Sequence, residues 1–196
     1  MILIGILERL ENLGNNNERY IEAIKRFGGT PLLIGTYNKE LLSLCNGLVI
    51  TGGNTKEELD DIFIKYALEH DLPLLGICQG MQSMALYETS NQLVSVFGHH
   101  SGEGYQHEVS FEESRLREII GKDKIKVNTY HYQTVKESKC FSVVGRGEDG
   151  VIEALENSAH PFQIGVQWHP ERMIDYDSDN RKIFEELITC SKRNAK

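Results

Sequence analysis

Short apolar runs alternate with longer segments of mixed polarity in the part of the chain before about residue 90. Each run is too short to form a helix and is bounded by Gly, Pro or polar residues, which is typical of buried strands in a parallel sheet. The strands predicted in this way cover residues 2–7, 31–34, 47–50 and 74–77. A polar loop is expected at residues 12–17, between the first strand and the first helix.

Apolar residues in the segments between these strands recur at every third or fourth position, which predicts amphipathic helices. The apolar positions of successive helices are Tyr20, Ile21, Ile24 and Phe27, then Leu41, Leu42 and Leu44, then Leu59, Ile62, Phe63, Tyr66 and Ala67, and finally Met81, Met84, Ala85 and Tyr87. Strands that alternate with helices, without repeats or low-complexity linkers, predict a doubly wound α/β sheet.

The pattern changes beyond about residue 90, where short strand candidates follow one another with few helices between them. These candidates are residues 93–97, 107–111, 124–127, 141–144, 151–155 and 162–167. Short strands in succession favour hairpins or an antiparallel extension of the sheet. Leu116, Ile119 and Ile120 allow one short helix among them, and residues 180–190 predict a closing amphipathic helix. The expected architecture is three-layered α/β, with a mainly parallel sheet and an antiparallel extension.

Composition adds the expected size of the folded unit and the partners that the net charge disfavours. At 196 residues the chain can bury a substantial core, so we expect a single domain over residues 1–196. A net charge of −8 argues against binding to nucleic acid or to an anionic membrane surface. No apolar run approaches the roughly 20 residues that span a bilayer.

The four cysteines and the start of the chain bear on the compartment. Cys45, Cys78, Cys140 and Cys190 are scattered without a CxxC pair, which fits reduced thiols in a cytoplasmic protein. The apolar residues 1–6 are followed closely by charged residues and lack the features of a signal peptide, so we interpret them as the first strand. We therefore expect a cytoplasmic location.

The first candidate for chemistry is the sequence Gly76-Ile77-Cys78-Gln79-Gly80, between the fourth strand and its helix. A nucleophile flanked by glycines at a sharp strand-to-helix turn is held in a strained backbone conformation, which small neighbours permit. The turn places the sulfur at a helix N-terminus, where negative charge is favoured. A buried free cysteine in a glycine-containing turn is the simpler interpretation of this motif taken alone.

The second candidate follows the last predicted strand, in the sequence Gly165-Val-Gln-Trp-His-Pro-Glu171. A thiol nucleophile needs a base, and a histidine base needs an acceptor that fixes its tautomer. His169 and Glu171 have these chemistries, and their spacing just past a strand lets both project to one side. A surface histidine beside a solvated glutamate is the alternative if this motif stands alone.

Together these motifs resemble those of the class I glutamine amidotransferase superfamily. Within it, the chain is most similar to stand-alone γ-glutamyl hydrolases of the peptidase C26 type, which include γ-glutamyl-GABA hydrolases. The matching segments are Thr51-Gly52-Gly53, Gly76-Ile-Cys-Gln-Gly-Met-Gln82, Gly98-His99 with His107 downstream, Val127-Asn-Thr-Tyr-His-Tyr-Gln133, and Gly165 to Glu171. They occur in the family's order over roughly two thirds of the chain. The resemblance also implies that family's three-layer, flavodoxin-like fold.

The resemblance implies roles for particular residues. It makes Cys78 the nucleophile, His169 the general base and then acid, and Glu171 the group that orients His169. It implies an oxyanion hole formed by the backbone N–H groups of Gly53 and Gln79. It also implies that Gly52, Gln82, Tyr130 and His131 bind the glutamyl part of a small-molecule γ-glutamyl substrate. No cofactor and no metal are expected.

Two segments depart from the family pattern and bear on substrate identity. After the Gly-Gly pair the family continues with an acidic residue and a proline-containing loop, whereas this chain has a short loop at residues 54–57. The family's second Gly-Gly pair, after the nucleophile helix, is replaced by residues 87–91. The leaving group of the substrate therefore stays open.

Several other polar and aromatic residues could contribute to the site. His99, His100 and His107 invite a metal, but adjacent histidines point opposite ways on a strand and no Cys or carboxylate completes a familiar ligand set, so we expect structural or substrate-lining roles. Arg9 and Arg19 could bind an anionic tail of the substrate, with solvated surface charge as the default. Tyr105, Tyr130 and Trp168 are candidates for the walls of the site, although buried aromatics more often serve packing.

Three functions follow from these motifs. The first is a hydrolase that cleaves a γ-glutamyl amide through a cysteine thioester and releases glutamate with an amine or a phosphoramidate, for example from a nucleotide-linked conjugate such as γ-glutamyl-CDP-amidate. The second is a glutaminase subunit that supplies ammonia to a separate synthase partner. The third is a catalytically silent binding module on the same fold. A homodimer is compatible with all three.

Overall fold

The computed structural model describes residues 1–9 and 15–194. Its central element is a nine-stranded sheet in the order β2-β1-β3-β4-β11-β10-β9-β6-β7. The strands in that order are β2 (Thr30–Ile34), β1 (Leu3–Leu7), β3 (Gly47–Ile50), β4 (Leu74–Ile77), β11 (Gln163–Val166), β10 (Ile152–Glu156), β9 (Ser142–Gly147), β6 (Gly102–Phe111) and β7 (Lys124–Thr129). Segments from both ends of the chain therefore meet in the middle of the sheet.

The sheet divides into a parallel and an antiparallel part, which confirms the predicted architecture. The strands from β2 to β11 pair in parallel. From β11 onward each strand pairs antiparallel with the next, through β10, β9, β6 and β7. β4 and β11 lie side by side at the boundary, so the segments that follow these two strands leave the sheet at the same edge.

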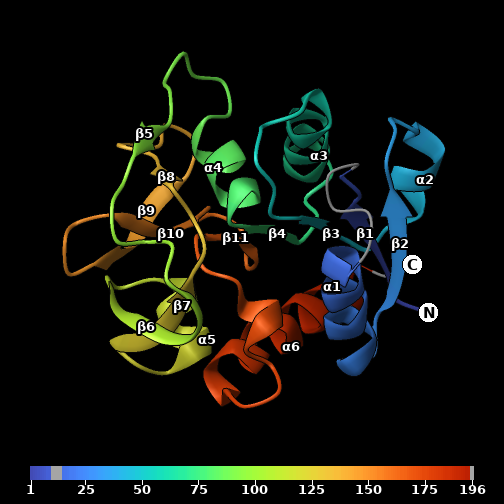
Figure 1. The fold of residues 1–196 in the computed structure, drawn as a ribbon. Coiled ribbons are helices and arrows are strands. Elements are labelled where there is room, and N and C mark those ends of the chain that lie inside the picture. Colours follow the sequence, from blue (N-terminus) through green and yellow to red (C-terminus); the bar gives the residue numbers. More distant parts are fainter. Residues whose placement is uncertain (10–14, 195–196) are drawn as a thin grey trace.

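Helices cover both faces of the sheet and make the fold three-layered (Figure 1). On one face lie α2 (Lys39–Leu44), α3 (Glu58–Glu69) and α4 (Gln79–Ala85), and on the other lie α1 (Asn15–Arg26), α5 (Arg115–Ile120) and α6 (Ser178–Arg193). Each face has its own apolar core. Neighbouring strand residues serve opposite cores, as the alternation of side chains along a strand requires: Val49 packs with α1 and α6, while Leu48 and Ile50 pack with α3.

The structure differs from the sequence-based expectations in three places. The strand predicted at residues 93–97 is reduced to β5 (Val94–Ser95), which pairs with β8 (Gln133–Thr134) in a separate two-stranded sheet. The apolar residues of this segment predicted a longer strand, but Phe97 at its end is 92% exposed. β6 begins at Gly102, five positions before the predicted start, as a long hairpin partner of β7. The loop expected at residues 12–17 lies partly outside the described residues, and α1 already begins at Asn15.

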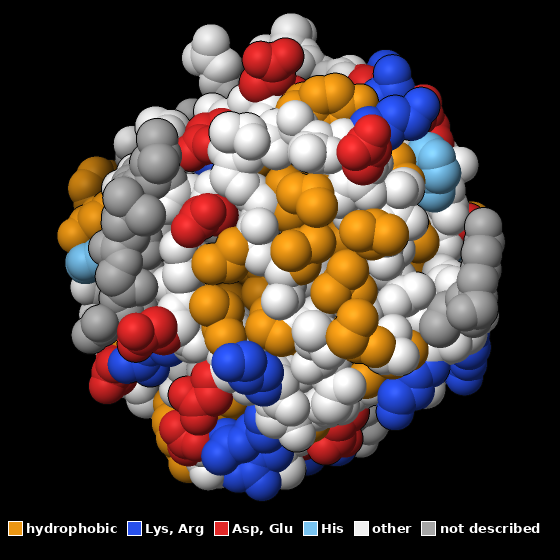
Figure 2. Space-filling model, turned by 90° about the vertical axis from the view of Figure 1, so that its right-hand side faces the viewer, with side chains coloured by type: hydrophobic (Ala, Val, Ile, Leu, Met, Phe, Trp, Pro, Cys, Tyr) orange, Lys and Arg blue, Asp and Glu red, His pale blue; other side chains and the backbone are white. Residues whose placement is uncertain are grey.

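One edge of the sheet is apolar and lacks a neighbouring strand among the described residues. β2 forms this edge, and Figure 2 shows hydrophobic side chains gathered on the face of the molecule to which it belongs. Leu32 and Leu33 are only partly buried there, and Leu44 of the nearby α2 is exposed. A homodimer stays a prediction. Separately, no helix within the described ranges is both long and apolar enough to cross a membrane.

The turn between β4 and α4 is packed too tightly for side chains larger than glycine's hydrogen. A Cβ on Gly80 would overlap the carbonyl oxygen of Ile50 in β3. A Cβ on Gly76 would lie 2.5 Å from Sδ of Met84 and 2.9 Å from the backbone of Gly80. This close approach is the physical reason for the glycines on either side of Cys78, as the sequence motif predicted.

We expect Gly80→Ala to lower the free energy of unfolding by at least about 1–3 kcal/mol, because α4 must move away from β3 to accept the methyl group. Urea denaturation followed by circular dichroism measures this change. Ser43→Ala, on an exposed position of α2, is the matched control and is expected to change stability by no more than about 0.5 kcal/mol. Equal stability of Gly80→Ala and the wild type would contradict the packing argument.

Candidate active site

Cys78 stands at the turn between β4 and α4 in a backbone conformation that a non-glycine residue rarely adopts. Its φ is 53° and its ψ is −105°, and it is one of three non-glycine residues with positive φ within the described ranges. Strain of this kind persists only where the surrounding structure holds it, and it is typical of nucleophile turns. The side chain is buried, with a relative exposure of 6%. The structure therefore has the sharp turn that the sequence motif predicted.

His169 reaches the same edge of the sheet from the neighbouring strand. β11 pairs in parallel with β4, with Val166 opposite Ile77, and the N–H of Cys78 donates a hydrogen bond of 2.8 Å to the carbonyl of Val166. His169 follows three residues after Val166, just before the short 3₁₀-helix η2 (Pro170–Arg172). The register between the two strands thus sets the position of the imidazole relative to the sulfur.

Gly52, in the loop after β3, marks the point where the two side chains meet. An ideal Cβ built on Gly52 would lie 2.8 Å from Cε1 of His169 and 3.4 Å from Cβ of Cys78. The imidazole and the nucleophile therefore flank one small volume that only glycine leaves open. The sulfur of Cys78 acts on the imidazole through its charge and through a side-chain hydrogen bond, and both raise the pKa of His169.

Glu171 holds the imidazole from the other side. Nδ1 of His169 donates a hydrogen bond of 2.7 Å to Oε1 of Glu171, and both side chains are buried. Because a carboxylate can only accept, this bond places a proton on Nδ1 and leaves Nε2 for chemistry. Sulfur, imidazole and carboxylate from three separate positions thus lie in the order that a cysteine-dependent triad requires.

The charge state of His169 follows from its surroundings. Burial alone lowers the pKa of His169, but the carboxylate of Glu171 and then the sulfur of Cys78 more than offset burial and raise the pKa to about 10. The imidazole is therefore protonated in the neutral range, which favours an ion pair with a thiolate at Cys78. A protonated imidazole is also the acid that a leaving amine needs.

Asn128, at the end of β7, fixes the backbone of His169. Its Oδ1 accepts a hydrogen bond of 2.8 Å from the N–H of His169, and its Nδ2 donates one of 2.8 Å to the carbonyl of the same residue. Asn128 is fully buried. This paired contact acts like one rung of a β-ladder and positions the imidazole from the antiparallel part of the sheet. Asn128 lies in residues 127–133, one of the segments that carry the family resemblance, but its role could not be predicted from the sequence.

The Thr51–Gly53 loop is held by two side chains whose roles the sequence did not reveal. The hydroxyl of Tyr20 in α1 accepts a hydrogen bond of 3.0 Å from the N–H of Gly52. Burial, followed by the nearby carboxylate of Glu171, raises the pKa of Tyr20 well above its ordinary value, so the phenol stays neutral. Tyr20 therefore positions Gly52 between the sulfur and the imidazole.

Arg9 has a structural position in place of the suggested contact with an anionic substrate tail. It is completely buried, and its guanidinium donates hydrogen bonds to the carbonyls of Thr51 and Thr55 at 3.3 and 3.1 Å. It also pairs with the buried carboxylate of Asp60 in α3. Arg9 is therefore buried and ion-paired, although it is charged, and it holds in place the loop that carries Gly52.

The predicted oxyanion hole lies in this loop and at the start of α4. Gln79 is the first residue of α4, where backbone N–H groups have no acceptor within the helix. Gly53 follows Gly52 directly after β3, beside the nucleophile turn. The arrangement is compatible with donation from the N–H groups of Gly53 and Gln79 to an oxyanion on the substrate, and this role stays a prediction.

The residues predicted to bind substrate lie in different surroundings. Tyr130 lies at the site, with its ring edge-to-face on His169 at a centroid distance of 5.5 Å and the guanidinium of Arg172 stacked 4.5 Å above it. The side-chain amide nitrogen of Gln82 donates to the carbonyl of Gln133 and to Oε1 of Gln167, which ties α4 to the antiparallel strands. The binding roles of Gly52, Gln82 and the backbone near Tyr130 and His131 stay predictions.

The side chains of His131 and Trp168 make their polar contacts with residues outside the triad. His131 lies 3.1 Å from His99 and 3.6 Å from Glu153, so it belongs to a cluster of imidazoles around one carboxylate. Trp168 is fully buried and donates from Nε1 to Asn180 in α6 at 2.8 Å, which makes it a core residue and not a wall of the site. Neighbouring residues alternate in direction along an extended chain, which explains why Trp168 and His169 face opposite ways.

Other candidate wall and tail-binding residues lie nearer the surface. Tyr105 is half-exposed and donates from its hydroxyl to Asp177 at 2.7 Å. Arg19 lies 3.6 Å from Glu103 and lines a depression of about 310 Å³ whose wall includes Glu171. This depression brings the carboxylate end of the triad close to solvent, and tail binding by Arg19 stays a prediction.

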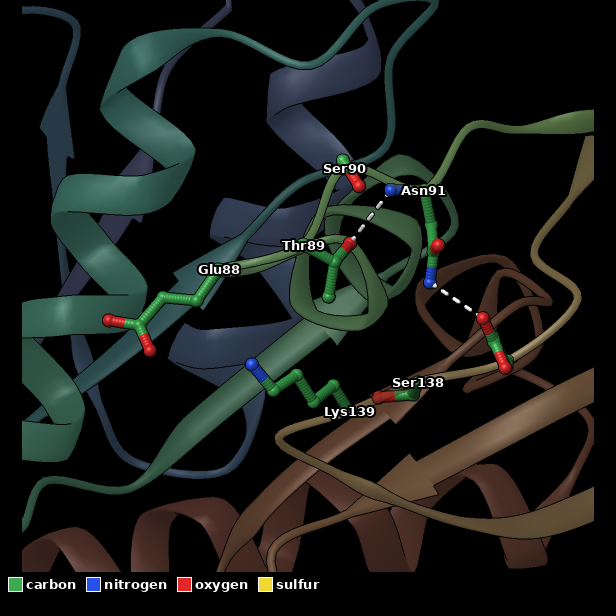
Figure 3. A pocket seen from close by; sticks show the side chains of 7 residues that line it. Glu88, Thr89, Ser90, Asn91, Ser138 and Lys139 are labelled. Atoms are coloured by element: carbon green, nitrogen blue, oxygen red, sulfur yellow. Dashed lines mark hydrogen bonds between the residues drawn. The ribbon is translucent and has the colours of Figure 1, made fainter.

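A second depression, of about 480 Å³, has no such chemistry. It lies between the α4–β5 and β8–β9 connections, where Nδ2 of Asn91 donates to Oε1 of Glu137 at 3.1 Å (Figure 3). Its lining residues are Glu88, Thr89, Ser90, Asn91, Glu137, Ser138 and Lys139. None of the proposed site residues is among them, and no cysteine or histidine lines it. We assign it no catalytic role.

Comparison with known proteins agrees with this geometry. The family model described as Peptidase C26 matches residues 8–171, so the chain belongs to the Peptidase C26 family and is a hydrolase that acts on C–N bonds. The chain is 30% identical to the "Putative glutamine amidotransferase PB2B2.05" of Schizosaccharomyces pombe over 93% of its length and 85% of that protein. It is 28% identical to the γ-glutamyl-γ-aminobutyrate hydrolase PuuD of Escherichia coli K12, over 88% and 85% of the two chains.

Solved structures share the fold at lower sequence identity. The glutaminase domain of Trypanosoma brucei CTPS with bound acivicin superposes with a TM-score of 0.75 at 14% identity, over all of this chain and 96% of that one. PurLQS from Thermotoga maritima gives a TM-score of 0.75 at 17% identity, over 96% and 98% of the two chains. These likenesses show the fold, which the resemblance in sequence had predicted.

We expect Gly52→Ala to slow alkylation of Cys78 at neutral pH by at least about tenfold. The added methyl group displaces the imidazole, and a loss of ~1.4 kcal/mol in thiolate stabilisation already lowers the thiolate population tenfold. Iodoacetamide labelling with peptide mapping measures the rate at Cys78. Thermal denaturation shows whether the variant is folded. An unchanged rate in a folded variant would contradict the placement of His169 beside Gly52.

Glu171→Gln is expected to lower the free energy of unfolding at pH 7 by about 3–5 kcal/mol, since it leaves a buried imidazole without its anion. The pKa of His169 is raised in the folded protein, so the stabilisation by Glu171 is fully present below the unfolded pKa of about 6.5 and is lost as the pH rises through about 10. The difference between variant and wild type therefore shrinks as the pH rises from about 6.5 to about 10 and is smallest above that range.

Urea denaturation of both proteins across this pH range tests that expectation. Glu22→Gln is the matched control, because Glu22 is exposed and lines the same depression as Glu171. The control is expected to follow the wild type at every pH. A stability difference for Glu171→Gln that stays constant through about pH 10 would show that the carboxylate does not act through a charged His169.

Proposed function

We propose that the protein hydrolyses a γ-glutamyl amide through a thioester on Cys78. The observation that carries the proposal is the placement of His169 between the carboxylate of Glu171 and the sulfur of Cys78, with Gly52 against both His169 and Cys78. This arrangement combines a nucleophile, a proton donor and a group that orients the donor. Amide cleavage by covalent catalysis requires these three functions.

In the first half of the reaction, the Cys78 thiolate attacks the γ-carbonyl carbon of the substrate. The electron pair of the carbonyl moves to oxygen, and the resulting oxyanion accepts hydrogen bonds from the N–H groups of Gly53 and Gln79. The tetrahedral intermediate then collapses, the C–N bond breaks, and the nitrogen takes the proton from Nε2 of His169. Loss of one oxyanion donor in such a site typically costs about 3–4 kcal/mol of transition-state stabilisation.

In the second half, water hydrolyses the γ-glutamyl thioester. Nε2 of His169, now neutral, accepts a proton from the attacking water, and the C–S bond breaks when the second tetrahedral intermediate collapses. Glutamate leaves, and the thiolate and imidazolium are restored. Glu171 keeps its hydrogen bond to Nδ1 of His169 throughout, so the imidazole turns neither during proton donation nor during proton acceptance.

The γ-glutamyl class of substrate is supported by relatives of similar length. The name of the Escherichia coli relative PuuD gives γ-glutamyl-γ-aminobutyrate as its substrate. The leaving group of this chain is proposed only as an amine or a phosphoramidate, such as that of γ-glutamyl-CDP-amidate. The same steps with ammonia as the leaving group describe a glutaminase subunit that serves a separate synthase, and the name of the Schizosaccharomyces pombe relative supports that alternative.

A panel of γ-glutamyl amides, with glutamine included, tests the proposal through release of glutamate. We expect turnover of at least one γ-glutamyl amine by the isolated wild-type protein, and a loss of at least about 10³-fold in Cys78→Ala because the covalent route is closed. Cys140→Ala is the matched control: Cys140 is an exposed cysteine and is expected to be dispensable.

The outcomes of the panel separate the candidate functions. Turnover in Cys78→Ala equal to that of the wild type would refute the thioester route. Release of glutamate from glutamine alone, and only after a synthase is added, would favour the glutaminase subunit. No turnover of any member, together with a Cys78 no more reactive than an ordinary cysteine, would favour a silent binding module.

A further inference from the structure

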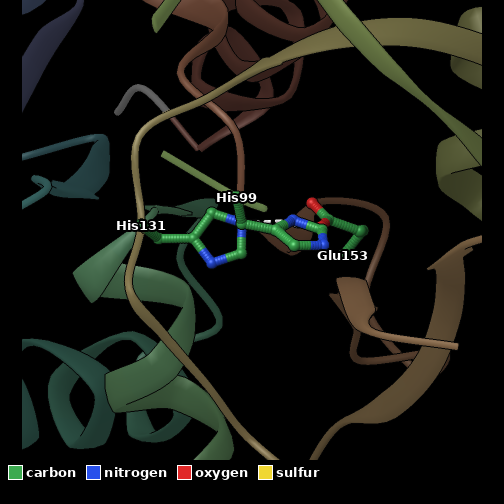
Figure 4. A group of neighbouring side chains, drawn as sticks. All are labelled: His99, His131 and Glu153. Carbon is green, nitrogen blue, oxygen red and sulfur yellow. Dashed lines mark hydrogen bonds and ion pairs between the residues drawn. The ribbon is translucent and has the colours of Figure 1, made fainter. Parts of the chain in front are cut away.

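A cluster of two histidines and a glutamate lies in the antiparallel half of the molecule, outside the proposed triad (Figure 4). His99 precedes β6, His131 lies between β7 and β8, and Glu153 belongs to β10. All three side chains are buried, and Glu153 is completely so. No carboxylate that completes a ligand set with these histidines is apparent in the sequence, and the structure supplies Glu153 from a strand far along the chain.

The donor atoms of this His99–His131–Glu153 cluster are spaced like the ligands of one ion. Nδ1 of His99 lies 3.1 Å from Nε2 of His131, and these nitrogens lie 3.4 and 3.6 Å from Oε1 of Glu153. A tetrahedral Zn²⁺ ion with bonds of about 2.0–2.2 Å holds its ligand atoms about 3.3–3.5 Å apart. The three distances therefore outline one face of such a tetrahedron.

The outward nitrogens of both histidines are committed to acceptors. Nε2 of His99 donates to the carboxylate of Asp149 at 2.8 Å, and Nδ1 of His131 donates to the carbonyl of Gln133 at 3.0 Å. Because a carboxylate and a carbonyl can only accept, the protons of the neutral imidazoles lie on these outward nitrogens. The inward nitrogens then present lone pairs to each other. Metal-bound histidines are commonly oriented in this manner.

Glu153 is a buried charge without an ordinary hydrogen bond. Neither of its carboxylate oxygens has a hydrogen-bond partner within the described part of the chain, although His107 approaches Oε1 to 3.2 Å. A buried carboxylate is costly unless positive charge faces it, and within the described part of the chain it is three imidazoles, at 3.2–3.6 Å from Oε1, that do so. The neighbouring imidazoles lower the pKa of Glu153 despite its burial, so the carboxylate stays ionised.

We propose that Nδ1 of His99, Nε2 of His131 and Oε1 of Glu153 form a binding site for a divalent transition-metal ion of the Zn²⁺ type. Two imidazoles and one carboxylate are a ligand set suited to Zn²⁺, and a fourth position is left for water.

The bound ion has a structural consequence for the catalytic site. His131 is the immediate neighbour of Tyr130, whose ring packs against His169. An ion that ties His131 to β10 and to the segment before β6 fixes the turn that carries Tyr130. The metal site therefore acts as a positioning element for the wall of the active site and supports the fold, without contact to the reacting atoms.

Titration of the metal-free protein with Co²⁺ tests the proposal directly. The Cys78→Ala background removes the nucleophilic thiol as a competing ligand, and a chelator followed by gel filtration removes metal carried through purification. We expect one Co²⁺ per chain, with the intense visible absorption of a tetrahedral nitrogen and oxygen site and no sulfur charge-transfer band. Zn²⁺ is expected to displace Co²⁺ and to raise the melting temperature of the metal-free protein.

Three variants in this background locate the site. Asp149→Asn keeps the side-chain oxygen that accepts from the N–H of Val151 but loses the acceptor for His99, and it is expected to weaken Co²⁺ binding by about 10- to 100-fold. His131→Gln removes a ligand and is expected to abolish the tetrahedral spectrum. His100→Gln is the matched control, because His100 is exposed and stacks on Tyr132 outside the cluster.

These measurements can refute the proposed metal site even if one of the variants does not fold. Absence of the tetrahedral spectrum and of stoichiometric binding in the folded Cys78→Ala parent overturns it without any cluster variant. Equal affinity in Asp149→Asn, whose carboxylate is half-exposed and whose folding is checked by circular dichroism, also overturns it. Loss of binding in His100→Gln alone would place the metal elsewhere.

Discussion

The candidate site depends on the parallel pairing of two strands that are distant in sequence. Cys78 directly follows β4 and His169 lies three residues after β11, and the pairing of these strands brings the two segments to one edge of the sheet. The bond from the N–H of Cys78 to the carbonyl of Val166 fixes the register. A shift of one residue would turn every side chain of one strand to the opposite face, so the chemistry and the sheet have to be assembled together.

Surrounding contacts convert this register into a definite geometry. Tyr20 and Arg9 hold the loop that places Gly52 between sulfur and imidazole, and Asn128 holds the backbone of His169. These contacts come from α1, from the segment after β1 and from β7, so both halves of the sheet take part. Buried, hydrogen-bonded supports of this kind keep reacting groups aligned before substrate arrives, which reduces the cost of reaching the transition state.

The sequence predicted those parts of the site whose physical cause is local. Cys78 is recognisable because its glycines are required by the close packing of α4 against β3, and Glu171 lies two residues from the histidine that it orients. The structural roles of Arg9 and Asn128 are not apparent in the sequence because their partners lie more than 40 positions away. Trp168 was assigned to the wall of the site although the alternation of side chains turns it into the core. Nothing in the sequence distinguishes Glu153 from other strand residues. Its neighbours His99 and His131 come from distant segments, which only the folded antiparallel part of the molecule brings beside it.

The central claim is that sulfur and imidazole, delivered by adjacent strands, form a reactive pair that takes up a γ-glutamyl group. Acid quenching during turnover of a γ-glutamyl amide, followed by mass spectrometry of the peptides, tests this claim most directly. The account predicts a γ-glutamyl adduct on the peptide that contains Cys78, and its disappearance when His169 is replaced by Gln. Turnover with no adduct on Cys78, under conditions in which thioester hydrolysis is the slow step, would contradict the account.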